Sequence, residues 1–310
     1  MKIRLGYACL SKTIDITSSS TYTYTNYLKD ENNLEKLDKI IISNLLDLEK
    51  ILDYNYKNNI HFFRLSSKLI PLATKDDVNF DYSNRYKMYY DRIANKIKTY
   101  DIRVDFHPDQ FTVLNSTRKE VLDNTFEILN YHYKMLENLK IKEKVLILHI
   151  GSSVLGKENS IKRFINNFKK LPTHIKESIA IENDDKIFNI NDCLKISNEL
   201  NIPIVLDYHH HICNYVDNVD FKKIFETWKN INPKIHFSSP KNKTKKDFRS
   251  HHDYINSNDF IEFIDKIKHL NFDVDIMIEA KAKDEALFRL VRELKYKTNY
   301  KFIDDTTFIV

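Results

Sequence analysis

The stretch SIAIENDDKIFNINDCLKISNELNIPIVLDYHH, residues 178–210, decides the fold. An apolar run at Ser178–Glu182 precedes a segment with helical spacing over residues 190–200, and a second apolar run follows at Ile202–Asp207. Strands that are continuously apolar are typical of a parallel sheet, because helices cover both of its faces. This strand–helix–strand unit therefore predicts an α/β protein.

The same alternation extends over the rest of the chain. Six more apolar runs are Ile3–Cys9, Ile60–Leu65, Ile102–His107, Val145–Ile150, Lys234–Phe237 and Val274–Glu279. Further helical patterns lie at residues 45–56, 84–99, 121–139, 159–170, 218–230, 257–270 and 284–296. Eight strands alternating with eight helices predict a single (β/α)8 TIM barrel over residues 1–310. A doubly wound open sheet is the alternative, and it would gather its ligand residues near one switch point.

Composition narrows the function classes. The chain has 310 residues, of which 42% are hydrophobic, and only three are glycine. There is no GxGxxG or GxxxxGK[ST] run, so we expect no nucleotide cofactor. The net charge of +5 permits a polyanionic partner. The densest basic stretch, which a solvated loop would also explain, contains Lys241, Lys243, Lys245, Lys246 and Arg249.

The cysteines and the apolar segments bear on the compartment. Cys9, Cys193 and Cys213 are odd in number and form no CxxC pair, so we expect neither a disulfide framework nor a thiolate zinc site. No segment is long and apolar enough for a signal peptide or a membrane span. We therefore expect a cytoplasmic monomer without membrane contact.

Polar side chains stand at the ends of the predicted strands, and in a barrel they would converge on one bowl. They are Tyr7, Arg64, His107, His149, Glu182, Asp207 with His210, His236 preceded by Lys234, and Glu279. Each one alone has an ordinary structural explanation, such as a hydrogen-bonded core histidine. Six successive strands ending this way predict a multi-metal site, with His251 or His252 as a further ligand. Imidazole and carboxylate ligands without thiolates suit Mn, Zn or Fe.

The predicted ions indicate a reaction class. Clustered divalent cations lower the pKa of bound water and stabilise an in-line phosphoryl displacement. Lys234 lies two residues before His236 and faces the same side of its strand. An ammonium group beside metals is electrostatically unfavourable, and a neutral lysine amine can add carbon dioxide. An outward-facing lysine, or one that contacts a DNA phosphate, is the alternative.

Nine segments, in order and over nearly the whole chain, resemble the motif series of the UV damage endonucleases. They are LGYACLS (5–11), RLSSKLIP (64–71), HPDQFTVLN (107–115), LHIGS (148–152), IENDD (181–185), LDYHHH (206–211), KIHFSS (234–239), HHDY (251–254) and IEAKAK (278–283). The resemblance implies a barrel related to the endonuclease IV type. It also implies a nick in damaged double-stranded DNA, just 5′ to cyclobutane pyrimidine dimers and 6-4 photoproducts.

The resemblance further implies three manganese ions, with Zn, Co or Mg as substitutes. The implied catalytic residues are Glu182, Lys234 and His236, and Lys234 is a candidate for carboxylation. The implied metal ligands are His107, His149, Glu182, Asp207, His210, His236, His251 and Glu279.

Three residues match lesion contacts of this family. Gln110 and Phe111 match the pair that pushes into the duplex, although some members have tyrosine at the second position. Tyr7 matches a tyrosine near the flipped nucleotides. The register H-x-D points to His251 rather than His252.

Three other functions compete with this interpretation. A plain apurinic-site endonuclease would bind abasic DNA and ignore dimers. A metal-dependent sugar isomerase could use a similar barrel site, but Gln110–Phe111–Thr112 is a poor sugar contact and a good duplex wedge. A non-enzymatic DNA-binding module would not need Glu182, Asp207 and Glu279, which repel phosphate unless metals neutralise them.

Overall fold

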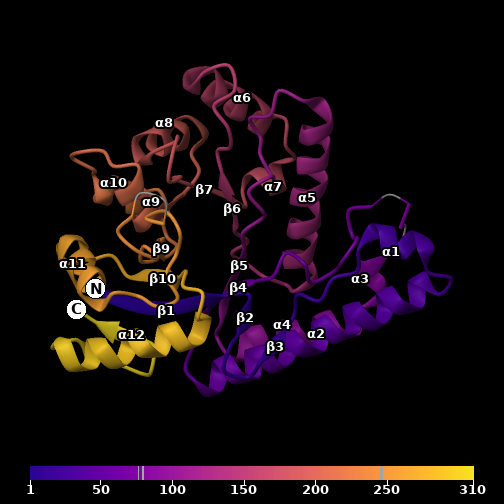
Figure 1. The fold of residues 1–310 in the computed structure, drawn as a ribbon, viewed down its shortest axis with the longest axis horizontal. Coiled ribbons are helices and arrows are strands. Elements are labelled where there is room, and N and C mark those ends of the chain that lie inside the picture. Colours follow the sequence, from indigo (N-terminus) through magenta and orange to yellow (C-terminus); the bar gives the residue numbers. More distant parts are fainter. Residues whose placement is uncertain (76, 79, 245–246) are drawn as a thin grey trace.

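Eight parallel strands form a closed barrel in the computed structural model, which describes residues 1–75, 77–78, 80–244 and 247–310 (Figure 1). Around the barrel they are β1 (Lys2–Ala8), β4 (Phe62–Leu65), β5 (Arg103–Phe106), β6 (Leu146–His149), β7 (Ile179–Glu182), β8 (Ile204–Asp207), β9 (Lys234–Phe237) and β10 (Val274–Ile278). β10 pairs with β1 from Ile3↔Val274 to Tyr7↔Ile278 and closes the sheet. The predicted barrel is confirmed, and the open sheet is excluded.

Helices surround the barrel and cover its outer face. They are α1 (Tyr24–Lys29), α2 (Asn33–Lys57), α3 (Tyr82–Arg85), α4 (Lys87–Thr99), α5 (Lys119–Asn138), α6 (Lys157–Lys169), α7 (Thr173–Lys176), α8 (Ile190–Leu200), α9 (Tyr208–Cys213), α10 (Phe221–Glu226), α11 (Ser257–Ile267), the 3-10 turn η1 (Lys268–Leu270) and α12 (Lys283–Lys297). Among the residues that the structure describes, no helix is both long enough and apolar enough to cross a membrane.

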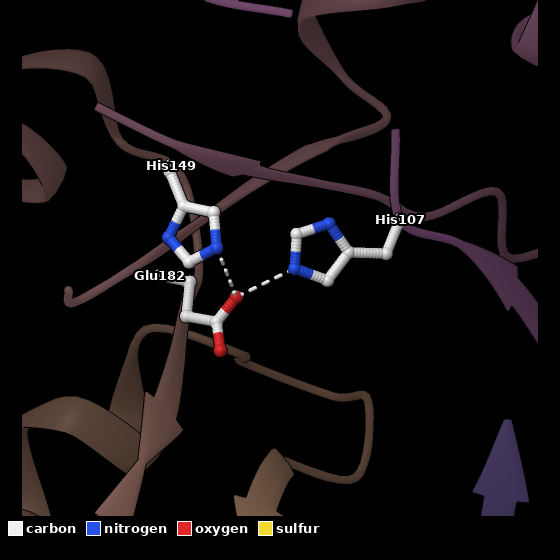
Figure 2. Close-up of side chains that lie close together, drawn as sticks. All are labelled: His107, His149 and Glu182. Atoms are coloured by element: carbon white, nitrogen blue, oxygen red, sulfur yellow. Dashed lines mark hydrogen bonds and ion pairs between the residues drawn. The ribbon is translucent and has the colours of Figure 1, made fainter. Parts of the chain in front are cut away.

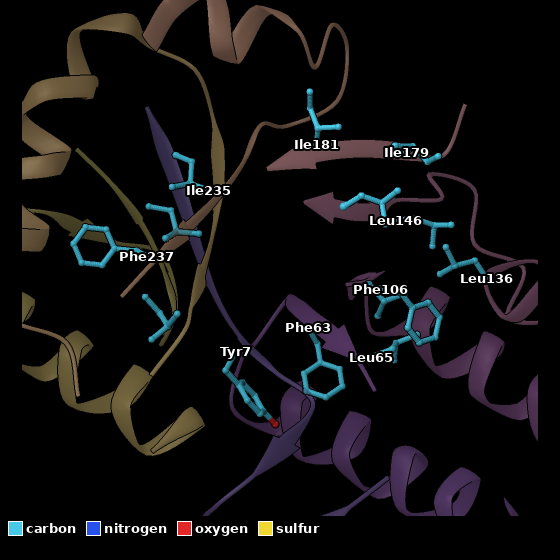
Figure 3. Packing of buried hydrophobic residues seen from close by; sticks show 14 of the residues in the cluster. Tyr7, Phe63, Leu65, Phe106, Leu136, Leu146, Ile179, Ile181, Ile235 and Phe237 are labelled. Atoms are coloured by element: carbon cyan, nitrogen blue, oxygen red, sulfur yellow. The ribbon is translucent and has the colours of Figure 1, made fainter. Parts of the chain in front are cut away.

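The strands are apolar because their outward side chains pack under the helices. On β9, Ile235 and Phe237 belong to the main core between sheet and helices, whereas Lys234 and His236 alternate with them and face the barrel interior. Figure 3 shows the same outward packing for Ile181 of β7. Alternation along each strand thus places the polar side chains inside the barrel.

Some elements differ from the sequence expectation. The helix expected at 84–99 is interrupted at Tyr86, whose hydroxyl donates to Asp38 at 2.5 Å. The helix expected at 218–230 shortens to α10, because Asn218 and Lys229 have positive φ. The short helix α9 was not predicted. It begins directly after Asp207, whose carboxylate accepts the His210 N–H at 2.7 Å.

Short strands outside the barrel were also not predicted. β11 (Lys301–Phe302) and β12 (Thr307–Ile309) form an antiparallel pair, and β12 joins the first half of β1 at Lys2–Arg4. β4 pairs with β1 only at Tyr7 and Ala8, so the C-terminal segment takes the part of the β1 edge that β4 leaves free. β2 (Leu10–Ser11) and β3 (Ile16–Thr17) form a separate hairpin after β1.

A buried ion cluster fills the N-terminal end of the barrel. Asp275 of β10 is fully buried, and its two carboxylate oxygens accept the Arg4 guanidinium at 2.6 and 2.8 Å. Arg103 of β5 donates to the same carboxylate at 2.6 Å, and its guanidinium lies 5.6 Å from the Trp228 ring centre. Two cations around one acid leave no buried negative charge uncompensated at this end.

Gly6 allows β1 and β4 to approach each other closely, and we predict that Gly6→Ala destabilises the fold. A Cβ at this position would lie 2.2 Å from the Phe62 carbonyl oxygen, so the two strands would have to separate. We expect a loss of about 1–3 kcal/mol in the free energy of unfolding, measured by urea denaturation. Thr17→Ala, at an exposed position of β3, is the control. Equal stability of the two variants would contradict the steric argument.

Candidate metal centre

Glu182, the last residue of β7, lies at the centre of the side chains that converge at the C-terminal end of the barrel. Its Oε2 lies 2.7 Å from His107 Nε2 and 3.5 Å from His149 Nε2. Figure 2 shows both rings directed toward this oxygen. Its Oε1 lies 2.6 Å from His236 Nδ1. The carboxylate therefore presents one oxygen to the histidines of β5 and β6 and the other to the histidine of β9.

Two groups of possible metal donors share this carboxylate. His107, His149 and Glu182 form one group, and Glu182, Asp207 and His236 form the other. In each group the donor atoms all lie within 4.8 Å of one another. This is a geometry in which one carboxylate could bridge two ions.

Asp207 at the end of β8 supplies an observation that fits a cation. Its Oδ1 caps α9, while its Oδ2 is buried and has no hydrogen-bond partner among the described residues. His210 Nδ1 is 3.5 Å from that oxygen. A buried carboxylate oxygen without a donor is unfavourable unless a cation approaches it.

Glu279 follows β10 and extends the donor set on the other side. Its Oε1 lies 3.4 Å from His236 Nδ1, and its Oε2 lies 4.0 Å from His251 Nδ1. His252 is exposed and turns away, because its Nδ1 accepts the Tyr254 N–H at 2.9 Å. The geometry thus favours His251 over His252.

The electrostatics of this region attract cations. Burial opposes ionisation of the Glu182 carboxyl, but His236, His149 and His107 lower its pKa well below its usual range. Burial likewise opposes the charged form of His210, yet Asp207 and the other carboxylates raise its pKa to about 9. Burial lowers the pKa of His149 to about 4, which keeps its ring in the neutral form that binds metals.

Lys234 lies one layer below, and its partner was not anticipated from the sequence. Its Nζ donates to Asp105 Oδ2 at 2.5 Å, and both side chains are fully buried. Burial lowers the pKa of Lys234 to about 8, while Asp105 opposes the shift. Because the side chain is buried, Lys234 neither points outward nor reaches a DNA phosphate in this structure. The predicted carboxylation stays a prediction.

Arg64 connects this layer to the donors above it. Its Nη1 donates to Glu279 Oε1 at 2.6 Å, and its Nη2 lies 2.6 Å from His236 Nε2. These contacts fix the orientation of the His236 ring, whose Nδ1 atom faces the carboxylates. Arg64 was noted as a strand-end residue, but this orienting contact has no signal in the sequence.

Asn183 is a second residue that sequence reasoning missed. Its side-chain amide donates to the Asp207 carbonyl at 2.9 Å and accepts the Asp207 N–H at 3.0 Å. The backbone carbonyl oxygen of Asn183 lies 3.0 Å from His210 Nδ1. It thereby fixes the ends of β7 and β8 side by side. The motif IENDD, which contains it, was the available signal.

The predicted wedge residues lie on an exposed loop after β5. Asp109 accepts the Phe111 N–H at 2.8 Å, and this turn leaves the Phe111 side chain 74% exposed. Gln110 and Phe111 line a groove of about 1070 Å³ together with His149 and His210. The groove thus runs from the wedge residues to the His, Asp and Glu side chains that converge around Glu182, which we call the donor cluster.

Tyr7, the third predicted lesion contact, lies elsewhere. Its side chain is fully buried, and its hydroxyl donates to Asn55 at 2.7 Å. Its ring packs edge-on against Phe63. Tyr7 could touch a nucleotide only after a rearrangement, so its lesion contact stays a prediction.

The basic stretch near residue 245 is only partly described. Lys245 and Lys246 lie outside the described residues, and Lys241 and Arg249 pair with acids.

A family model described as UV-endonuclease UvdE matches residues 3–307, which include every side chain of the donor cluster. The chain belongs to this family. A UV DNA damage endonuclease of Bacillus cereus is 40% identical over 307 residues, which cover 95% of each chain. One of Bacillus thuringiensis subsp. konkukian is 37% identical over 316 residues, which cover 99% of each.

One solved structure supports the same family, and another shows the fold alone. The chain is similar to one described as "Crystal Structure of SacUVDE", with a TM-score of 0.86, 34% identity, and 95% and 98% of the two chains covered. An L-ribulose 3-epimerase aligns with a TM-score of 0.56 and 14% identity over 98% of this chain and 90% of that one. At that identity the epimerase shows the barrel fold alone.

Carboxylation of Lys234 can be tested by intact mass under non-acidic conditions. We expect the metal-loaded protein to carry the extra mass of one carbon dioxide. A neutral amine held in a dry site can add carbon dioxide and release one proton, and the single N–H of the resulting carbamate could still donate to Asp105. Lys234→Arg keeps the charge and cannot form a lysine carbamate, so it is the control. The same unmodified mass in both proteins would rule the modification out.

Proposed function

We propose that the chain nicks the phosphodiester just 5′ to UV photoproducts in double-stranded DNA, using ions held by the donor cluster around Glu182. The observation that carries this proposal is the position of the Glu182 carboxylate between two groups of donors, in a chain that matches the UvdE family over residues 3–307. The relatives named UV DNA damage endonucleases support the lesion class.

Different residues of the cluster would hold different ions. His107 and His149 would hold one ion with Glu182, and Asp207 and His236 would hold another. His210, His251 and Glu279 border the same cluster and would complete a third site. Bound divalent cations would lower the pKa of a water molecule and stabilise the attacking and leaving oxygens of the phosphodiester.

Other residues would position these ligands. Arg64 holds the His236 ring and Glu279, and Asn183 holds the Asp207 backbone. Lys234 lies beneath His236 and donates to the Asp105 carboxylate. Oriented supports of this kind typically change metal affinity or activity by about 10–100-fold when removed. We propose Mn²⁺ as the metal, with three ions in a monomeric protein.

Damage recognition would rest on the wedge loop. A photoproduct weakens stacking, so a duplex that contains one costs less to kink and unstack than an intact duplex. Phe111 is exposed at the tip of its loop and lines the groove that leads to His149. Insertion of its ring would bring the neighbouring phosphodiester toward the donor cluster.

An apurinic-site endonuclease remains a second candidate, because the donor cluster alone would serve it equally well. The exposed wedge loop and the family match favour UV lesions. A sugar isomerase has less support, since the epimerase likeness shows the fold alone.

Incision assays test the function. The protein with Mn²⁺ should nick a UV-irradiated duplex, and EDTA should abolish the nick. Glu182→Ala should reduce incision roughly a hundredfold or more, because outer contacts alone change activity by about 10–100-fold. Its metal content should fall, while lesion binding remains, since binding depends on cationic and wedge contacts.

Glu177→Ala is the matched control for this assay, because Glu177 is an exposed acid just before β7, at the opposite end of that strand. It should incise like the unmodified protein. Incision of an abasic duplex without any incision of the UV-irradiated one would favour the apurinic-site function. Full incision by Glu182→Ala would exclude Glu182 as a ligand.

Phe111→Ala should weaken binding to a lesion duplex by about 1–3 kcal/mol, because it removes one stacking contact. Binding to undamaged duplex should change less, since an intact stack does not open to the ring. Phe111→Tyr should keep the affinity, and Tyr296→Ala, at an exposed aromatic on α12, should leave both affinities unchanged. Equal losses on both duplexes with Phe111→Ala would indicate a packing role instead.

A further inference from the structure

The loop after β6, residues 150–156, presents two aliphatic side chains to solvent beside the donor cluster. Val154 is 50% exposed and Leu155 is 72% exposed. Val154 lines the same groove as Phe111 and His149. A single exposed aliphatic residue needs no explanation, but two adjacent ones, of which Val154 lines this groove, are typical of an interaction surface. We call Val154 and Leu155 the aliphatic tip.

The backbone of this loop adopts a conformation that favours glycine. Leu155 has a φ of +63° and Gly156 a φ of +93°. A large side chain at positive φ is unusual, because its Cβ approaches the carbonyl oxygen. The surrounding structure maintains this conformation although the leucine side chain gains no burial from it. Stability therefore does not explain why a leucine occupies the position.

Side-chain hydrogen bonds hold the aliphatic tip in place. The Val154 carbonyl accepts from the Arg163 guanidinium and from the Ser160 hydroxyl, the latter at 3.1 Å. The Leu155 carbonyl accepts from the Asn159 amide at 2.8 Å. All three donors come from α6, so the tip is fixed to a helix while its side chains remain exposed. A preorganised apolar contact loses little conformational entropy on binding.

The same contacts join the aliphatic tip to the wedge loop. Asn115, which follows Phe111 on the loop after β5, donates through its side chain to the Ser152 carbonyl at 2.7 Å. Arg163 donates to the Asn115 carbonyl at 2.9 Å. The two loops leave neighbouring strands and are cross-linked through the buried Asn115 and the half-buried Arg163, so these hydrogen bonds hold Phe111 and the aliphatic tip at a set spacing.

We infer that Val154 and Leu155 make a second apolar contact with the damaged duplex, alongside Phe111. Three cationic side chains, Lys75, Arg118 and Lys186, line the groove and could contact phosphates. Three acids line it as well, namely Glu120, Asp184 and Asp185, so the apolar side chains and not a net positive charge distinguish this surface. Aliphatic side chains press against base steps in kinked DNA. An uncharged contact of this kind adds affinity for distorted DNA without reading sequence. The inference rests on the proposed function, because it takes the same lesion duplex as partner.

Binding titrations with a fluorescent lesion duplex and the matching undamaged duplex test this contact. Leu155→Ser should weaken lesion binding on the order of tenfold, as expected for one buried aliphatic side chain, and Val154→Ser should act in the same direction. Undamaged binding should change less. The slope of affinity against salt should stay that of the unmodified protein, because no ion is released at an uncharged contact.

Two controls separate this role from general effects. Ile303→Ser replaces an equally exposed aliphatic residue between β11 and β12, at the N-terminal end of the barrel, and should change nothing. Arg118→Gln, in the same groove, should reduce the salt slope. Thermal unfolding of both tip variants should match that of the unmodified protein, since their side chains are exposed.

The outcomes are distinguishable from failure of the proposed function. If the unmodified protein does not prefer the lesion duplex, the proposed function and this inference both fail. If it does prefer the lesion duplex and both tip variants bind it equally well, only the inference is overturned. Equal losses on lesion and undamaged duplexes would also overturn it. A loss of self-association in the tip variants, in place of a loss of lesion binding, would overturn the inference too. It would assign the surface to a second copy of the chain.

Discussion

Closure of the sheet between β1 and β10 is the constraint on which the rest of the structure depends. A closed parallel barrel brings the carboxyl ends of all eight strands to one face, whatever their separation along the chain. His107 and Glu182 are 75 residues apart, and Glu182 and His236 are 54 apart, yet each pair is in contact. In an open sheet, strands as distant in the order as β5, β7 and β9 could not converge on one carboxylate. The donor cluster is therefore a direct consequence of the topology.

Compensation of buried charge organises the interior of the barrel. At its N-terminal end, Asp275 accepts from two arginines, and one layer higher Asp105 accepts from Lys234. Arg64 then links that layer to the donor cluster. Such pairs contribute little net stability, but breaking one is costly, so they fix the positions of their members. Asp207 lies in the next layer, where its buried Oδ2 has no hydrogen-bond donor in the described part of the chain and His210 Nδ1 lies 3.5 Å from it. A cation bound in the proposed metal centre would compensate the charge of this carboxylate.

The loops that surround the donor cluster expose apolar side chains, in contrast to the charged interior of the barrel. They are the loops after β5 and β6. Their backbones are held by a hydrogen bond to the Asp109 carboxylate and by hydrogen bonds from Asn115 and from side chains of α6. Rigid loops on a rigid barrel can test how easily a duplex deforms, because they do not adapt to an undistorted one. The barrel thus supplies both the fixed donor cluster and the fixed contacts that would select its substrate.

The sequence by itself determined the barrel, because eight continuous apolar runs alternating with helical patterns admit few other arrangements. It also identified the residues that converge around Glu182. Most of them are His, Asp or Glu at the point where an apolar strand ends, and the carboxyl ends of barrel strands lie on one face. Only the tertiary structure decided the contacts between strands distant in sequence. It paired Lys234 with Asp105, oriented His236 through Arg64, and buried Tyr7 against Asn55. It also added β12 to the free edge of β1 and formed α9 on the Asp207 cap. These features depend on which side chains meet across the barrel, and local pattern carries no information about that.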